Sequence, residues 1–268
     1  MSDKNLFKVA KDGNIAWLTF DRPEKRNSMN LEFFQGLIQH FTGFDQDPEV
    51  RVVIVKAEGE SFTAGIDLFA MGTLLQGEGA AFREELRNKI VQLQDSMNTI
   101  ERCRKPVIAA VHSHCIGGGV DLLSACDIRM ASRDAVFAIR ETRIAIIADL
   151  GTLQRLPYII GQGWFRELAL TGRNFSADEA LKMGFITRLF EDRQTLYQEA
   201  RKVALEIAEC SPLAVQGVKE VINYSRDHGV YPGLEYVAQK NAALLPSEDL
   251  TEAFKAFVEK RPPKFKGK

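Results

Sequence analysis

The feature that most constrains this chain is an apolar segment that runs into a cluster of three glycines. The apolar segment covers residues 106–111, and the glycines are Gly117, Gly118 and Gly119. β-Branched residues between Pro and Gly predict a buried strand, and residues 120–126 predict the helix that follows it. The first N–H groups of such a helix have no intrahelical partner. The junction therefore suits a phosphate or a developing oxyanion.

Two phosphate-binding patterns can be tested directly against these glycines. A dinucleotide fingerprint would need a third glycine where Leu122 stands, and the chain contains no P-loop sequence. The glycines then either present N–H groups to a carbonyl oxygen or form only a tight turn, and glycine content alone leaves both alternatives open.

Three acids near the glycines favour the first alternative. Asp121 opens the predicted helix, whereas Glu141 and Asp149 lie in apolar surroundings. An unpaired carboxylate in such surroundings is costly, and burial raises its pKa toward the range useful for proton transfer. The structural alternative is that nearby arginines neutralise these acids, namely Arg140, Arg143 or Arg155.

Composition excludes several other classes. The chain has 268 residues, 45% of them hydrophobic, which suffices for one large α/β domain or a core with a helical appendage. A formal charge of −1 gives no basic excess for nucleic acid, and no apolar run reaches the ~20 residues that span a bilayer. The His112, His114 and Cys115 cluster fits turn residues better than a metal site. Cysteines without C-x-x-C spacing and the lack of an export signal suggest a reducing, cytoplasmic setting.

The N-terminal part repeats the pattern of a strand followed by a glycine turn. Strands are predicted at residues 15–20 and 52–55, with Asn30 as the N-cap of the intervening helix. The basic loop at residues 22–27, with Lys25 and Arg26, is either a solvated turn or a place for an anionic ligand. Glycines at residues 71–80 suggest a mobile loop around residues 73–76, followed by an amphipathic helix at 81–102.

The C-terminal part is predicted to be mostly helical. Ser176 opens a capping box, Gly184 ends that helix, and residues 185–190 form a last strand. From residue 196 the pattern stays helical to the end. We therefore expect a core at residues 1–195 that holds the site, and a helical region at 196–268 that serves oligomerisation.

The two glycine turns together resemble the crotonase (enoyl-CoA hydratase/isomerase) superfamily. The matching motifs are Ala64-Gly65-Ile66-Asp67-Leu68 and Gly117-Gly118-Gly119-Val120-Asp121. The resemblance implies an α/β spiral of repeated β-β-α units and an acyl-CoA thioester as substrate, with no separate cofactor. It also implies an oxyanion hole made by the N–H groups of Ala64 and Gly118, with the substrate lying along residues 64–68.

Within this superfamily the acids select the reaction. A hydratase pattern has Glu at the positions of Asp121 and Glu141 and no acid at Asp149. The set found here resembles the isomerases that convert 3,5-dienoyl-CoA to 2,4-dienoyl-CoA in the β-oxidation of unsaturated fatty acids. That resemblance assigns proton transfer at carbon 2 to Glu141 and proton transfer at carbon 6 to Asp149. Asp121 would orient or tune these two acids. The alternatives are an enoyl-CoA hydratase and a non-catalytic acyl-CoA- or RNA-binding relative.

The resemblance also implies quaternary structure and ligand contacts. It predicts a homotrimer or homohexamer in which C-terminal helices pack on a neighbour. Lys25 and Arg26 are candidates for contact with the CoA phosphates. The acyl chain would lie near Leu68, Phe69 and Met71 and the segment 74–75.

Overall fold

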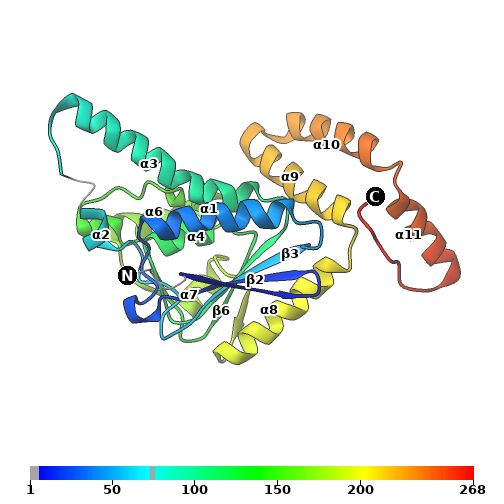
Figure 1. The fold of residues 1–268 in the computed structure, drawn as a ribbon, viewed down its shortest axis with the longest axis horizontal. Coiled ribbons are helices and arrows are strands. Elements are labelled where there is room, and N and C mark those ends of the chain that lie inside the picture. Colours follow the sequence, from blue (N-terminus) through cyan, green and yellow to red (C-terminus); the bar gives the residue numbers. More distant parts are fainter. Residues whose placement is uncertain (1–5, 73–75) are drawn as a thin grey trace.

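A six-stranded sheet forms the centre of the molecule in the computed structural model, which describes residues 6–72 and 76–268 (Figure 1). The strand order is β1-β2-β3-β4-β6-β9. β1 pairs antiparallel with β2 through the turn at Gly13, and every other pairing in this sheet is parallel. The strands are β1 (Phe7–Asp12), β2 (Ile15–Phe20), β3 (Val52–Ala57), β4 (Val107–Val111), β6 (Ile128–Ser132) and β9 (Arg188–Phe190).

Helices cover both faces of this sheet, which explains why its inner strands are apolar on both sides. On one face Val53 and Val55 pack in a core with helices α1 (Leu31–Gln46), α3 (Gly79–Arg102) and α4 (Gly118–Ala125). On the other face Val52 and Ile54 pack against α8 (Arg193–Ala208). As predicted, the Asn30 side chain accepts a hydrogen bond from Phe33 N at 3.0 Å and begins α1.

A second, three-stranded sheet produces the repeated units. It has the order β5-β7-β8, with β5 (His114–Ile116), β7 (Val136–Ala138) and β8 (Phe175–Ser176). β4, β5 and α4 form one β-β-α unit, and β6, β7 and the 3-10 helix η3 (Glu141–Ile144) form another. These repeats agree with the predicted α/β spiral, and β5 lies where the sequence indicated only a turn.

Short helices lie between β7 and β9. These are α5 (Thr152–Arg155), η4 (Leu156–Tyr158), α6 (Gln162–Thr171) and α7 (Ala177–Lys182), in addition to η1 (Pro23–Lys25) and α2 (Leu68–Gly72) earlier in the chain. The predicted capping box at Ser176 is confirmed by both of its hydrogen bonds. The last strand is shorter than predicted, because β9 begins only at Arg188.

The C-terminal helices form a separate layer. They are α9 (Pro212–His228), α10 (Val230–Leu244) and α11 (Glu248–Glu259), and they project away from the sheet (Figure 1). α8 crosses the expected boundary at residue 195 and packs on the sheet, so the projecting part begins at α9. Among the described residues, no helix is both long and apolar enough to cross a membrane.

Candidate active site

The two glycine turns predicted from the sequence lie against each other. Thr63 N donates to His114 O at 2.9 Å, and Ile116 N donates to Thr63 O at 3.2 Å. Gly65 has a φ of +89°, and a Cβ there would stand 2.6 Å from Ile116 O. Only glycine avoids both the backbone strain and this clash. The turn after β3 is thereby held beside the start of α4.

The hydrogen bonds of the first turn correct one predicted donor. Ala64 N donates to Arg26 O at 2.9 Å, so this N–H is not free to bind a ligand. The assignment of Ala64 to the oxyanion hole is therefore wrong. The sequence pattern could not reveal this, because the competing acceptor lies 38 residues earlier in the chain.

The free donors are the N–H groups of Ile66 and Gly118. No described residue accepts a hydrogen bond from either N–H group. The residues that flank Ile66 do form hydrogen bonds: Gly65 O accepts from Met29 N, and Asp67 N donates to Met29 O. Gly118 is the first residue of α4, where N–H groups lack intrahelical acceptors. A Cβ on Gly118 would stand 3.3 Å from Ile66 Cγ1, which places the two residues side by side. Gly118 N thus is the free donor that its predicted role requires, and Ile66 N, not Ala64 N, is the free donor beside it.

The neighbouring glycines leave room for the rest of the site. Gly117 has a φ of +54°, and a Cβ there would stand 3.0 Å from Glu141 Oε1. A Cβ on Gly119 would stand 2.5 Å from Thr63 Cγ2 and 2.8 Å from Cys115 Sγ. Gly117 brings the Glu141 carboxylate next to the donors, and Gly119 lets α4 pack closely on the first turn.

The three predicted acids come from three different segments. Asp121 lies in α4 and is 1% exposed, whereas Glu141 begins η3 and is 5% exposed. Asp149 is half-buried in the irregular segment between η3 and α5. Asp121 Oδ1 accepts a hydrogen bond from Thr152 N at 2.8 Å, which ties α4 to α5 just beyond Asp149.

The nearby arginines form no ion pair with these acids in the described part of the chain, although the charge of Arg155 acts to lower the pKa of Asp121. Arg140 contacts Asn174, Arg143 donates to Thr171 O, and Arg155 pairs with Glu101. In the described part of the chain, none of the three acids forms an ion pair. Glu141 Oε2 is buried and has no hydrogen-bond partner among these residues. The structural alternative therefore does not account for the acids.

Burial and mutual repulsion hold protons on this cluster. Burial, followed by the negative charge of Asp121, raises the pKa of Glu141 to about 7. Burial raises the pKa of Asp121 to about 6, although the hydrogen bond from Thr152 opposes the shift. Burial also raises the pKa of Asp149. Around neutral pH such a cluster can hold one carboxyl group protonated and another ionised.

Asp67 was predicted to line the substrate, and the structure shows its carboxylate bonded within the turn. Its carboxylate forms an ion pair with Arg22 at 3.0 Å and accepts from Ala70 N at 3.2 Å. These partners fix the turn between β3 and α2, so Asp67 holds the turn in shape. Leu68, the next residue, is 53% exposed.

The predicted CoA contacts lie at the surface of the same turn. Lys25 and Arg26 are exposed, and Arg26 borders a cavity of about 360 Å³ together with Ala64 and His114. Segment 73–75, part of the predicted mobile loop and acyl-chain contact, lies outside the described residues.

His112, which follows β4, lies against α8. His112 Nε2 lies 3.1 Å from Gly59 O, and its Nδ1 lies 3.2 Å from the hydroxyl group of Tyr197 in α8. Within residues 6–72 and 76–268, no group of His, Cys, Asp or Glu side chains could hold a metal ion. All four cysteines are free.

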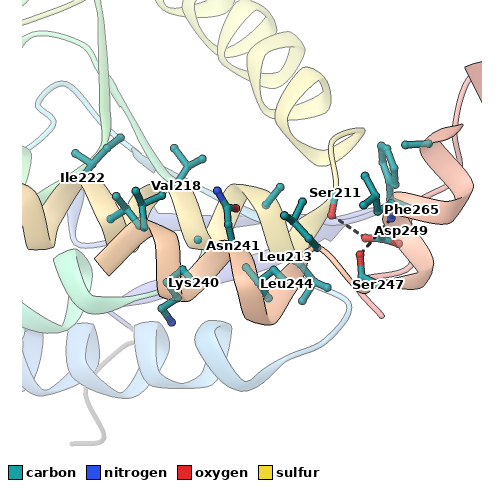
Figure 2. A pocket seen from close by; sticks show the side chains of 17 residues that line it. Ser211, Leu213, Val218, Ile222, Lys240, Asn241, Leu244, Ser247, Asp249 and Phe265 are labelled. Atoms are coloured by element: carbon teal, nitrogen blue, oxygen red, sulfur yellow. Dashed lines mark hydrogen bonds between the residues drawn. The ribbon is translucent and has the colours of Figure 1, made fainter. Parts of the chain in front are cut away.

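A separate apolar cavity of about 390 Å³ lies among the C-terminal helices (Figure 2). Val218 and Ile222 of α9 line it together with Leu244 of α10. Ser211 Oγ donates to Asp249 Oδ2 at 2.8 Å at its edge. None of the three acids and neither glycine turn lines this cavity, so it is distinct from the candidate active site.

Comparisons with known proteins agree with this geometry. A mitochondrial Delta(3,5)-Delta(2,4)-dienoyl-CoA isomerase of Dictyostelium discoideum is 44% identical over 99% of this chain and 93% of its own length. A peroxisomal protein of the same name from Arabidopsis thaliana is 45% identical over 95% of this chain and 93% of its own length. The crystal structure of an enoyl-CoA hydratase from Bacillus anthracis has a TM-score of 0.91 and 32% identity, covering 98% of this chain and 100% of that one.

These relatives also correct the expected location. The prediction of a cytoplasmic setting is wrong, because the relatives at 44% and 45% identity are described as mitochondrial and peroxisomal. Free cysteines fit a reducing compartment, but they do not distinguish among such compartments.

The family itself follows from the extent of the match. A family model described as Enoyl-CoA hydratase/isomerase matches residues 10–268, which include both glycine turns and all three acids. The chain belongs to the enoyl-CoA hydratase/isomerase family.

Proposed function

We propose that this chain is an isomerase that converts a 3,5-dienoyl-CoA to the 2,4-dienoyl-CoA. The observation that carries the proposal is Asp149, a third acid without an ionic partner in the described chain, whose charge acts on Glu141, the carboxylate next to Gly117. The relatives from Dictyostelium and Arabidopsis that carry this activity in their names match nearly the whole chain.

Two proton transfers at separate carbons account for the need for more than one acid. The Glu141 carboxylate removes a proton from carbon 2, and the electrons of that C–H bond form an extended enolate. Its negative charge lies on the thioester oxygen, where the N–H groups of Ile66 and Gly118 stabilise it. Losing one such donor typically costs on the order of 100–1,000-fold in rate.

The second transfer completes the isomerisation. The protonated carboxyl group of Asp149 gives its proton to carbon 6, the thioester carbonyl re-forms, and double bonds remain at carbons 2 and 4. Glu141 ends protonated and Asp149 ends ionised, so the substrate changes neither composition nor charge. Asp121 raises the pKa of Glu141 through its charge and holds α5 through Thr152 N.

Hydration of an enoyl-CoA is the second candidate, since the Bacillus anthracis structure is of an enoyl-CoA hydratase. A hydratase holds its water between two carboxylates, and the position of the first is taken here by Asp121. Its side chain is one methylene shorter than Glu, and its Oδ1 already accepts from Thr152 N. Both features leave water poorly held and favour isomerisation.

The C-terminal helices support a homotrimer or homohexamer as a further part of the proposal. Phe254, Phe257 and Val258 follow helical spacing on α11 and are 66%, 84% and 79% exposed. Exposed apolar groups on one helix face are typical of interaction surfaces. Phe257→Glu should lower the oligomer mass measured by light scattering, and an unchanged mass would exclude this surface from the interface.

The basic loop is the proposed CoA contact. Lys25 and Arg26 supply exposed positive charge beside the turn that holds the donors. Replacing both with Gln should raise KM for the CoA ester without changing kcat, because the phosphates lie far from the reacting carbons. An unchanged KM would remove these residues from the CoA site.

Asp149→Asn tests the assigned chemistry. The variant should lose formation of the 2,4-diene while still exchanging the carbon-2 protons of the 3,5-dienoyl-CoA in D₂O, because Glu141 and both donors remain. Asp178→Asn is the matched control, since Asp178 is 67% exposed and distant in sequence from the cluster. Isomerisation at the wild-type rate by Asp149→Asn would refute the role assigned to Asp149.

A further inference from the structure

The segment that carries Asp149 has no regular secondary structure to hold it. Residues 145–150 lie between η3 and α5 and belong to neither a helix nor a strand. Among the described residues, one side chain outside this segment forms a hydrogen bond with Asp149: Gln94 Nε2 of α3 donates to Asp149 O at 2.7 Å. Gln94 precedes Asp149 by 55 residues, so the bond joins distant parts of the chain.

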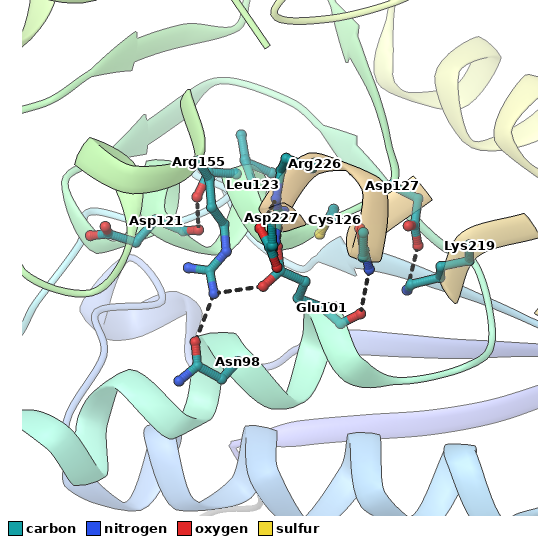
Figure 3. A network of polar contacts seen from close by, with 12 residues as sticks. Asn98, Glu101, Asp121, Leu123, Cys126, Asp127, Arg155, Lys219, Arg226 and Asp227 are labelled. Carbon is teal, nitrogen blue, oxygen red and sulfur yellow. Dashed lines mark hydrogen bonds and ion pairs between the residues drawn. The ribbon is translucent and has the colours of Figure 1, made fainter. Parts of the chain in front are cut away.

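Arg155 holds the other end of the same segment, and Figure 3 shows its guanidinium group bonded to Asn98 and Glu101 of α3. Its Nη1 donates to Leu150 O at 3.4 Å, and its Nη2 donates to Asn98 Oδ1 at 2.7 Å and to Glu101 Oε2 at 3.0 Å. A Cβ on Gly151 would stand 1.8 Å from Arg155 Nη1, and Gly151 has a φ of +126°. The guanidinium group therefore lies directly against the residue two positions after Asp149.

The three contacts on α3 come from one face of that helix. Gln94, Asn98 and Glu101 are spaced by four and three residues, as neighbours on a helix surface are. A polar cavity of about 620 Å³ adjoins this face and is lined by all three, together with Asp149 and Arg155. Ala148 and Leu150 are buried in the apolar core. Polar side chains and open space border the α3 side of the segment, so on this side hydrogen bonds anchor the backbone at Asp149.

We propose that Gln94 and Arg155 are positioning residues that hold Asp149 in place for proton transfer at carbon 6. The inference rests on the proposed isomerase function and extends it to groups that touch no substrate. The Glu141 carboxylate lies at Gly117, which is fixed by the bond from Gly117 N to Ala138 O at 2.8 Å. The α3 contacts are made at Asp149 and Leu150, beyond the bonds from Ala145 N and Ile146 N to Glu141 O. Loss of the α3 contacts should therefore separate the two proton transfers.

Gln94→Leu is the direct test, since leucine keeps helix propensity and removes the donor. We expect kcat for diene formation to fall about 10- to 100-fold, because small displacements of a catalytic group cost this much. KM and carbon-2 exchange in D₂O should stay within about 2-fold of wild type, because binding and the Glu141 step are intact. Gln92→Leu is the matched control: it makes the same change on α3 at an exposed side chain that lines a different cavity.

Two further variants keep the test decisive. Gln94→Met retains nearly the size of the side chain and cannot donate to Asp149 O, so it should give the same separation even if Gln94→Leu folds poorly. Arg155→Lys cannot make the three contacts of the guanidinium group together, and it should lower kcat without affecting carbon-2 exchange.

The possible outcomes separate this inference from the function on which it rests. Wild-type kcat in Gln94→Leu, or an equal loss of carbon-2 exchange and diene formation in a folded variant, would overturn the positioning role. A wild-type protein that exchanges carbon-2 protons without forming the diene would instead refute the proposed function, and the inference with it.

Discussion

Replacing Asp121 with Asn should shift the pH dependence of the reaction to lower pH. Burial and then the Asp121 charge raise the pKa of Glu141 from 4.5 to about 7. The substitution removes the charge and leaves the burial. The amide oxygen of the new side chain can still accept the hydrogen bond from Thr152 N, so the local structure is retained. The pKa of Glu141 should therefore fall below 7 but stay above 4.5.

The size of the effect follows from the ionised fraction of Glu141. With a pKa of about 7, roughly a tenth of Glu141 is ionised and able to act as a base at pH 6. A like charge this close typically contributes on the order of one pKa unit, so about half would be ionised in the variant. Activity at pH 6 relative to pH 8 should then rise about 5-fold.

The assay is the pH profile of kcat/KM for diene formation, which reports ionisations of the free enzyme. Wild type should lose activity as the pH falls through about 7, and Asp121→Asn should lose it at lower pH. A profile that does not move, or that moves to higher pH, would refute the assigned interaction between Asp121 and Glu141.

Three other changes test stability and packing. Glu141→Gln should abolish carbon-2 exchange, yet raise the free energy of unfolding above pH 7 by at most about 3 kcal/mol. The raised pKa of Glu141 gives stability that is present below pH 4.5 and lost as the pH rises through about 7, and the Gln variant does not undergo this loss. Equal urea midpoints of wild type and variant at pH 8 would contradict this. Gly119→Ala should cost about 1–3 kcal/mol in urea unfolding through its clashes, whereas Gly43→Ala, with open space around it, should not destabilise. Lys219→Met should cost about 1–3 kcal/mol, because it removes the ion pair of a buried ammonium group with Asp127, whose carboxylate keeps the hydrogen bond from Val107 N. The exposed Lys202→Met should cost less than about 1 kcal/mol; similar melting temperatures for the two variants would refute this.

Local sequence patterns predicted much of the core. The apolar runs that became β2, β3 and β4 are buried on both faces of the sheet, so nearly every residue carries the signal. β1 was not predicted, because most of its side chains are exposed and the strand lacks such a run. The Asn30 cap and the Ser176 capping box were predicted correctly because their bonds span only three residues.

Long-range contacts set the limit of what the sequence could predict about the site. The glycines and acids were found from residue type and local surroundings. The donor in the first turn was misassigned because Ala64 N bonds a residue of an earlier loop, which leaves Ile66 free. Gln94 gave no signal at all, since its contact with Asp149 depends on how α3 crosses the segment before α5.

The most direct measurement of the central claim is an absorbance assay of the purified protein with a 3,5-dienoyl-CoA, run in parallel with a 2-enoyl-CoA. We expect the 2,4-diene to form rapidly from the first ester and little hydration of the second. Hydration of the 2-enoyl-CoA without formation of the diene would contradict the account, because Asp149 would then have no part in the reaction.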